Sequence, residues 1–337
     1  MKAVAYTQNA LPIDDPQSLI DLELPMPEPG PRDLLVQVRA VSVNPVDTKI
    51  RHRAAVQAPR VLGWDAVGVV QAVGSAASLF KVGDPVFYAG SITRPGSNSE
   101  YQLVDERIVG HKPASLSDAQ AAALPLTAIT AWELLFERLG VSEGGGEGQS
   151  LLVTGAAGGV GSILIQLARR LTRLTVIGTA SRPETAQWVR EMGAHHVIDH
   201  GRPLAAELEA AGLPLVDMVA SLTHTEQHYA EIIKALRPQG KLALIDDPAP
   251  GALDVTLLKS KSISLHWELM FTRSLFETPD MIEQHRLLDR VAQLVDDGTL
   301  KTTLSEEFGA INAANLRRAH ALLESHRSVG KIVLAGF

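Results

Sequence analysis

A glycine-rich turn at residues 155–161 constrains the fold of this chain more than any other feature. The apolar run SLLVTG precedes it with the composition of a buried strand, and VGSILIQLARRL follows with apolar residues at helical spacing. A strand that enters a glycine-rich turn and continues as a helix is the first half of a βαβ unit. The turn therefore predicts a parallel sheet covered by helices in this part of the chain.

The turn also has the spacing A-x-G-x-x-G of a dinucleotide-binding loop. Ala156 allows a tight turn, Gly158 lets the backbone approach a pyrophosphate, and Gly161 lets helix and strand pack closely. Free N–H groups and the positive end of the helix dipole would face the phosphates. The predicted loop residues are Ala156, Gly158, Gly159, Val160 and Gly161. The alternative is a glycine-rich turn that binds nothing, but the strand and helix around it favour the dinucleotide site.

The rest of the chain predicts two kinds of architecture. Beyond residue 150, short apolar strands alternate with helices, which indicates a doubly wound parallel sheet. Its predicted strands are SLLVTG, LTVIGTA, HHVIDH, LVDMVASL and KLALIDD, and its predicted helices are VGSILIQLARRL, PETAQWVREMG and TEQHYAEIIKALRPQG. Residues 1 to about 125 are instead rich in short β-branched runs separated by Gly, Pro and Asp, which indicates a barrel or sandwich.

Several connecting segments have patterns of their own. Prolines 25, 27, 29 and 31 predict a stiff connector between the first two strands. The run SDAQAAALPLTAITAWELLFERLG predicts a helix that is interrupted at Pro125 and capped by Ser117 or Asp118. Towards the C-terminus we expect strands at SISLHWELMF and KIVLAGF and amphipathic helices at IEQHRLLDRVAQLVDDG and NAANLRRAHALLESH.

Composition excludes several classes of function. A chain of 337 residues exceeds one ordinary core, so two domains are expected, and 45% apolar with 20% charged residues is typical of a soluble globular protein. The net charge is −7 without a run of like charges, which does not indicate a nucleic-acid groove. The absence of cysteine excludes disulfides, thiolate metal sites and cysteine nucleophiles, and agrees with a cytoplasmic location. We see no signal peptide and no run of 18 apolar residues, so no membrane association is expected.

The end of the second predicted strand, LTVIGTASRPE, bears on cofactor choice. NAD-binding units place an acid there to accept a hydrogen bond from the ribose 2′-OH. Here the first acid is Glu184, preceded by Ser181 and Arg182, a hydroxyl and a guanidinium that suit a 2′-phosphate. We therefore expect NADPH. The alternative is that Arg182 is simply solvated.

At this point the sequence resembles the medium-chain dehydrogenase/reductase superfamily, and within it the zinc-independent quinone-oxidoreductase branch, often labelled zinc-type alcohol dehydrogenase-like. The resemblance covers the whole chain and is carried by MKAVAY, AVSVNPVDTKIR, GWDAVGVVQAVG, FKVGDPVFYAG, LPLTAITAWELL, VTGAAGGVGS, MGAHHVIDH, LRPQGKLALI and GKIVL. It implies an α/β chain with a GroES-like β-barrel catalytic domain at 1–124, completed by 268–337. It also implies a Rossmann NADP-binding domain at 125–267, with the active site in the cleft.

The resemblance further indicates that zinc is absent. Zinc-dependent relatives carry a cysteine where this chain has Asn44, and a His-Glu pair where it has Trp64 and Asp65. Their third ligand lies where this chain reads Ala-Leu-Pro at 123–125. Because all three positions have changed, we expect no metal site.

Without zinc, a substrate carbonyl must be polarised by hydrogen-bond donors. By the resemblance, Asn44 is the first candidate, with a turn residue before a proline as the alternative. Asp47 would orient this loop, and Lys49 would be the proton source or an exposed structural lysine. Trp64 would lie at the floor of the cleft, where packing is the alternative to stacking on substrate.

The resemblance also implies further cofactor contacts. Thr127 and Thr130 would meet the nicotinamide carboxamide or ribose, and Lys331 would reach the pyrophosphate. His200 would lie beside the 2′-phosphate, although a solvated histidine and a surface lysine are the alternatives for His200 and Lys331. The predicted contacts at the carboxyl ends of the later strands are Ser221, Thr223 and Ile245.

The expected function is an NADPH-dependent oxidoreductase that transfers hydride to a quinone, enone or related carbonyl without catalytic zinc. The alternatives are an NADPH-binding protein with a crystallin-like or RNA-binding role and a zinc-dependent alcohol dehydrogenase. The expected partners are a small-molecule substrate and a second copy of the chain in a homodimer. The apolar run SISLHWELMF is suited to pairing the sheets of two subunits edge to edge.

Overall fold

In the computed structural model, which describes residues 1–337, six strands between residues 150 and 267 pair in parallel. Their spatial order is β11 (His196–Ile198), β10 (Thr175–Thr179), β9 (Ser150–Thr154), β12 (Val216–Ser221), β13 (Leu236–Leu244) and β14 (Ser264–Trp267). Every neighbouring pair is parallel. The direction of winding reverses between β9 and β12, which is the switch point where doubly wound sheets bind ligands. The predicted parallel sheet is confirmed.

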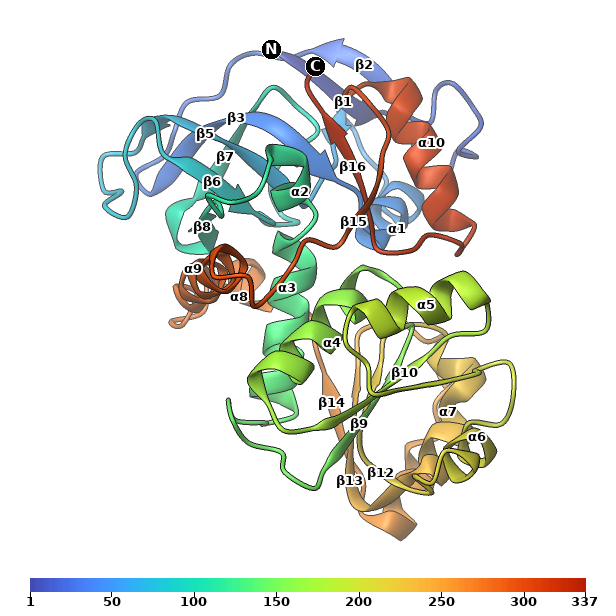
Figure 1. Cartoon of the computed structure of the whole chain (residues 1–337). Helices are drawn as coiled ribbons and strands as arrows, with labels where there is room; N and C mark the ends of the chain where they lie inside the picture. The colour runs from blue at the N-terminus through green and yellow to red at the C-terminus, as the bar shows by residue number, and fades with distance from the viewer. The chain divides into compact units, whose positions relative to one another are not determined.

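Helices cover both faces of this sheet (Figure 1). They are α4 (Gly159–Leu171), α5 (Pro183–Glu191), α6 (Leu204–Ala210) and α7 (Thr225–Ala235). Neighbouring residues of β10 show the two layers, because successive strand residues point to opposite faces. Ile177 packs in one core with Leu208 of α6 and Ile232 of α7. A Cβ on Gly178 would instead lie 2.5 Å from Val189 of α5.

The remaining strands form two further sheets, which are mainly antiparallel. One sheet has the order β15 (Leu304–Glu307), β16 (Lys331–Ala335), β3 (Asp33–Ser42), β5 (Ala66–Val73), β6 (Pro85–Tyr88) and β8 (Val109–His111), with β7 (Tyr101–Asp105) also paired to β3. Only the β15–β16 pair is parallel. In the other sheet, β1 (Lys2–Tyr6) lies between β2 (Ile20–Glu23) and β4 (Arg60–Val61). The helices around these sheets are α1 (Pro45–Arg53), α2 (Asp118–Ala122), α8 (Thr272–Phe276), α9 (Glu283–Asp296) and α10 (Ala313–Glu324).

The chain divides into two units. The first comprises Met1–Ile129 and Phe271–Phe337, and the second comprises Thr130–Met270. These bounds lie within five residues of the domain boundaries expected at 124/125 and 267/268. The second unit therefore contains the whole parallel sheet and its glycine-rich turn.

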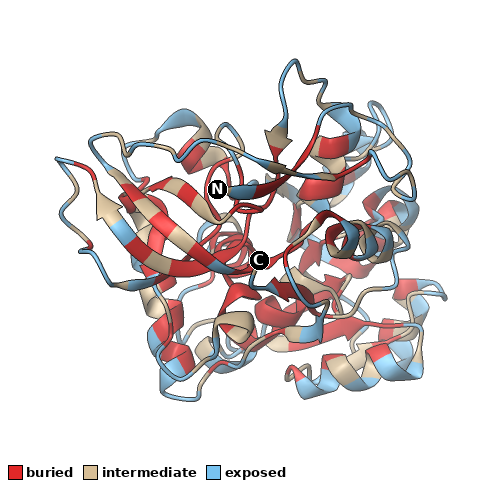
Figure 2. Cartoon of the chain, turned by 90° about the horizontal axis from the view of Figure 1, so that it is seen from above, coloured by how far each residue is buried: buried red, intermediate tan, exposed pale blue.

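Burial follows the predicted patterns closely in the amphipathic helices. Five apolar residues of α9, the helix expected to be amphipathic, are all at most 5% exposed, and they are Leu287, Leu288, Val291, Leu294 and Val295. Figure 2 shows the same contrast throughout, with buried residues along the strands and exposed residues on the outer sides of the helices. Apolar periodicity thus located the core-facing sides correctly.

Two predicted element boundaries were wrong. The short strand β2 was missed, so the proline-rich connector lies between β2 and β3 and not between the first two strands. The helix predicted to extend through LRPQG ends at Ala235, and β13 begins at Leu236. The pairing of β12 with β13 shifts register between Val216 and Met218, where a bulge accommodates Pro238 and the positive φ of Gln239.

The apolar helical segment around Pro125 consists of α2, α3 (Pro125–Trp132) and a π-helical stretch, Glu133–Arg138. The Ser117 hydroxyl caps α2 by accepting from the Gln120 N–H, as one of the two predicted caps. By length and composition, Asp118–Arg138 is the one helical stretch that is apolar enough to cross a membrane. However, 78% of its most apolar window is buried inside the structure, as in the core helix of a globular protein.

Candidate active site

The glycine-rich turn connects β9 to α4 at the switch point of the parallel sheet (Figure 1). Gly155 has a positive φ of 68°, so the tight turn occurs at this residue, one position before the predicted Ala156. Gly158 then caps α4 in an extended conformation. A Cβ on Gly161 would lie 2.5 Å from the Ala156 carbonyl oxygen, so only glycine lets α4 pack this closely on the turn.

The start of α4 is open to a ligand. A Cβ on Gly158 would meet only the Gly155 carbonyl oxygen, at 3.4 Å, and residues 157–160 are half-buried. The N–H groups of Gly159, Val160 and Gly161 belong to the first helical turn, where no intrahelical acceptor exists. These donors without a helical acceptor, together with the missing side chain at Gly158, fit a pyrophosphate group.

Hydroxyl groups gather at the carboxyl ends of β9 and β12 beside the turn. The Ser221 and Thr225 hydroxyl oxygens are 2.7 Å apart, and the Thr154 hydroxyl donates to Ser221 over 3.3 Å. Thr225 in turn donates its N–H and hydroxyl to the Asp246 carboxylate. Ser221 is therefore a buried member of a network that connects β12, α7 and the end of β13.

Two other predicted cofactor contacts also lie at this edge of the sheet. The Thr223 methyl group lies 2.9 Å from where a Cβ on Gly155 would stand, which places Thr223 against the phosphate loop. Ile245 follows the last residue of β13 and is half-buried.

The residues predicted to contact the 2′-phosphate follow two neighbouring strands, β10 and β11. Thr179 of β10 pairs with Ile198 of β11, so the chain segments that carry Arg182 and His200 begin at the same edge. Ser181 is exposed, and the half-buried Arg182 lies 3.3 Å from the Glu184 carboxylate.

His200 has a histidine neighbour. Its ring meets that of His228 edge to face, with ring centroids 5.9 Å apart. Burial lowers the pKa of both imidazoles, and the nearby His224 lowers both further, while Asp199 opposes the shift at His200.

A separate buried polar cluster lies in the other unit, at the start of α1. Asn44 is the N-cap of α1, and its N–H donates to the Asp47 carboxylate over 2.7 Å. The Asn44 amide nitrogen donates to Asp65 over 2.8 Å, and its amide oxygen accepts from Lys331 Nζ over 2.5 Å. Lys331 Nζ also lies 3.0 Å from the Asp65 carboxylate. All four side chains are at most 4% exposed.

These contacts correct two predicted roles. The Asn44 amide nitrogen is buried among Asp65 and two backbone carbonyls, so it is not directed at a substrate oxygen. The Lys331 ammonium is enclosed by Val43, Asn44 and Asp65, so it does not extend to a pyrophosphate. In both cases a polar side chain that suited a ligand has formed its hydrogen bonds inside the protein.

Burial also sets the protonation of the two acids. It raises the pKa of Asp47 to about 7, with Asp65 adding to the rise and the Asn44 N–H and Lys331 opposing it. Burial likewise raises the pKa of Asp65, against the opposing effect of Lys331 and of hydrogen bonds from Asn44 and the Leu126 N–H. The Leu126 bond measures 2.7 Å. The three donors around Asp65 thus oppose the rise in pKa that burial causes.

The other predicted residues differ in exposure. Trp64 is fully buried, with its indole N–H donating to the Ser91 carbonyl and its ring edge-on to Phe271 at 6.3 Å, which is a packing role. Thr127 and Thr130 are at most 5% exposed, and the Thr127 hydroxyl donates to a backbone carbonyl. Lys49, in contrast, is half-buried on α1.

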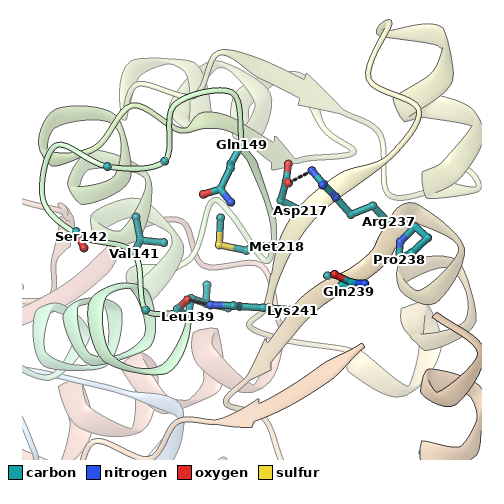
Figure 3. A pocket seen from close by; sticks show the side chains of 14 residues that line it. Leu139, Val141, Ser142, Gln149, Asp217, Met218, Arg237, Pro238, Gln239 and Lys241 are labelled. Atoms are coloured by element: carbon teal, nitrogen blue, oxygen red, sulfur yellow. Dashed lines mark hydrogen bonds and ion pairs between the residues drawn. The ribbon is translucent and has the colours of Figure 1, made fainter. Parts of the chain in front are cut away.

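A cavity of about 350 Å³ lies at the opposite edge of the parallel sheet. Figure 3 shows Gln149, Asp217 and Arg237 on its wall, with Arg237 paired to Asp217. These residues lie at the amino ends of β9, β12 and β13, away from the carboxyl edge at which doubly wound sheets bind cofactors. The cavity is therefore separate from the phosphate loop.

Several partners in the buried cluster could not be predicted from the sequence. The Val43 carbonyl and the Leu126 N–H hold Lys331 and Asp65, and both are backbone groups without a side-chain signature. Asp65 was singled out only as a replaced metal ligand, although it accepts more hydrogen bonds in the cluster than any other member.

Two family profiles match the chain. A profile described as alcohol dehydrogenase GroES-like domain matches residues 30–114, and one described as zinc-binding dehydrogenase matches residues 192–334. Among similar sequences, the zinc-type alcohol dehydrogenase-like protein of Staphylococcus aureus (strain MSSA476) is 43% identical over 91% of this chain and 92% of its own length. The quinone oxidoreductase of Pseudomonas aeruginosa is 32% identical over the same shares, 91% and 92%.

Solved structures are similar over the entire chain. A Rhizobium etli CFN 42 protein assigned as a zinc-dependent alcohol dehydrogenase is 56% identical, with a TM-score of 0.96 over 100% of this chain and 98% of the other. A mycobacterial protein complexed with NADPH is 27% identical, with a TM-score of 0.83 over 99% of both chains.

Proposed function

Because this chain belongs to the medium-chain dehydrogenase/reductase family and is an oxidoreductase like its named relatives, we propose that it reduces a quinone, an enone or a related carbonyl with NADPH and without catalytic zinc. The family match also confirms the predicted fold class, a GroES-like domain with a Rossmann-type parallel sheet. A homodimer in the cytoplasm completes the proposal.

The end of β10 carries the choice of NADPH. No carboxylate follows Thr179 until Glu184, so the end of β10 lacks the acid that NAD-binding units place there. Arg182, the N-cap residue of α5, carries a guanidinium that can bind phosphate oxygens in pairs. The mycobacterial relative complexed with NADPH supports the same cofactor.

The residues of this chain do not fit the zinc that the relatives' names imply. A catalytic zinc requires three protein ligands. Asp65 is the one acid at the matching positions, and its carboxylate already accepts from Lys331, Asn44 and the Leu126 N–H. No three His, Asp or Glu side chains gather anywhere in the structure in a way that could hold a metal ion. The proposed reaction therefore uses no metal ion.

When bound, the cofactor would supply a hydride from its nicotinamide ring. The N–H groups at the start of α4 would hold the pyrophosphate, and Arg182 would hold the 2′-phosphate. Of the four predicted catalytic residues, only Lys49 has a side chain that is not enclosed. We assign Lys49 Nζ as the group that holds the proton delivered to the substrate oxygen or carbon after hydride transfer. The similarity to a protein named quinone oxidoreductase supports a quinone as the acceptor. A quinone accepts hydride with little carbonyl polarisation.

The test is a comparison of NADPH and NADH with a simple quinone and an enone as acceptors. A charge-assisted contact contributes about 1.5–3 kcal/mol, so kcat/KM should favour NADPH about tenfold or more. Replacing Arg182 with Ala should raise KM for NADPH by about the same factor and leave KM for NADH almost unchanged.

Arg173→Ala is the matched control, because Arg173 precedes the amino end of β10 and forms only an exposed ion pair with Glu147. It should change neither KM. Equal use of both cofactors by the wild type would refute the NADPH assignment. Tight NADPH binding without oxidation by any acceptor would instead favour a binding protein.

A further inference from the structure

Lys331, on the last strand β16, directs its ammonium into the buried cluster at the start of α1. Nζ lies 2.8 Å from the Val43 carbonyl oxygen, 2.5 Å from Asn44 Oδ1 and 3.0 Å from Asp65 Oδ2. The lysine side chain is 4% exposed and the Asp65 side chain is fully buried. A lysine is rarely this deeply buried unless its charge is compensated.

The three partners come from two segments, one with Val43 and Asn44 and the other with Asp65, and both are far from Lys331 in the sequence. Asn44 begins α1, Asp65 precedes β5, and the second oxygen of Asp65 accepts from the Leu126 N–H at the start of α3. Asn44 also closes the arrangement by donating to Asp65 over 2.8 Å. One ammonium thus connects the C-terminal strand directly to two other segments of the first unit and, through Asp65, to the start of α3.

The cluster contains two buried acids, Asp47 and Asp65, but one lysine, Lys331. Asp47 and Asp65 are both fully buried, and Lys331 is the cation that acts on both. Removing the ammonium would leave two buried carboxyl groups with hydrogen bonds only, and burying an uncompensated charge is strongly unfavourable.

We propose that Lys331 is a positioning residue that supplies, as a side chain, the positive charge a metal ion would otherwise supply here, so that it fixes Asn44 and Asp65 and closes the site to metals. This inference rests on the proposed metal-free reductase function. It replaces the pyrophosphate role that motif position had suggested for the same lysine.

A double-mutant cycle tests the ion pair. Lys331→Met keeps the length of the side chain without its charge, and Asp65→Asn removes the carboxylate but keeps an acceptor for the Leu126 N–H. Each single variant should lower Tm by about 5–10 °C, because each leaves the other charge buried and unpaired. The double variant should recover most of this loss. Lys81→Met, at an exposed lysine of the same unit, is the control and should leave Tm unchanged.

Steady-state kinetics distinguish a positioning role of Lys331 from a role in cofactor binding. Lys331→Met, assayed below its Tm, should lower kcat tenfold or more with KM for NADPH within twofold of the wild-type value. The double variant should recover Tm but not kcat, because Asn44, the N-cap of the helix that carries Lys49, still lacks the ammonium that fixes it. Zinc added to the wild type should bind without stoichiometry and leave Tm unchanged.

Three results would overturn the inference: additive losses of Tm in the cycle, a large rise in KM for NADPH with kcat intact, or stoichiometric zinc binding by the wild type. The Tm cycle requires no activity. A wild type that reduces no acceptor would therefore refute the proposed function and still leave the role of Lys331 open to measurement.

Discussion

His320 is a buried imidazole in α10 whose two ring nitrogens have no hydrogen-bond partner. Burial lowers its pKa to about 3, and the neighbouring Arg51 and His52 contribute further. The folded state therefore holds the neutral ring over a pH range in which an unfolded chain would bind a proton. Because the unfolded state binds more protons below pH 6.5, stability decreases as pH falls from 6.5 towards 3.

Replacing His320 with Leu should remove this pH dependence. The free energy of unfolding of the variant, relative to the wild type, should rise by about 2 kcal/mol between pH 7.5 and pH 5, since each pH unit below 6.5 costs the wild type about 1.4 kcal/mol. Urea unfolding at the two pH values measures the difference. His326→Asn, at an exposed histidine just after the same helix, is the control. A difference that stays constant with pH would contradict the account.

The sequence singled out residues that meet in the buried cluster, but their hydrogen bonds could not be predicted at this scale. The Asn44 backbone N–H donates to Asp47 and its amide contacts the Trp64 carbonyl. The partner of Asn44 is Lys331, 287 residues away in the sequence, and no local pattern indicates that contact. Burial determines whether a polar side chain can contact the substrate, because an enclosed amide or ammonium forms its hydrogen bonds inside the protein.

At the scale of elements, the turn before α4 contains one glycine that the fold requires and one that leaves room for a ligand. Gly161 has no room for a Cβ, whereas Gly158 does, and both lie at the same phosphate loop. The two glycines thus serve different purposes, although the sequence motif lists them together.

Gly161→Ala should lower Tm, with a cost of about 1–3 kcal/mol for forcing α4 away from the turn. Gly158→Ala should keep the wild-type Tm but raise KM for both NADPH and NADH, because its methyl group would occupy the approach to the helix N-terminus. Thermal unfolding and steady-state kinetics of the pair check this. Equal losses of Tm in both variants would be inconsistent with the loop geometry.

Periodicity predicted the parallel sheet and its helices because each strand is apolar throughout and each helix has one apolar side. The short strand β2 was missed because its residues alternate between half-buried and exposed, so its stability comes from pairing with β1. The end of α7 was misplaced for a similar reason. The segment after Ala235 pairs with β12 through a bulge, and that tertiary pairing overrides the local helical pattern.

At the scale of the whole molecule, the edge strand β14 is the surface that we propose for the homodimer. It pairs only with β13, and the apolar side chains Trp267 and Leu269 beside it are 52% and 51% exposed. Unpaired edges with apolar side chains favour pairing with a second copy.

Light scattering at micromolar concentration should give a mass near twice 36.1 kDa. Trp267→Glu combined with Leu269→Glu should give the single-chain mass, because the charges would disfavour edge pairing. Val82→Glu, at an exposed apolar residue in a turn of the first unit, should leave the dimer intact. A wild-type mass equal to one chain would exclude this assembly.

We propose that the whole molecule transfers hydride from NADPH without a metal, with Lys331 as the internal cation of its buried cluster. The most direct measurement combines metal analysis with activity after exhaustive treatment with a strong chelator. We expect less than a tenth of an equivalent of zinc per chain and unchanged NADPH–quinone turnover. Loss of turnover on chelation, restored by added zinc with one equivalent bound, would contradict the account.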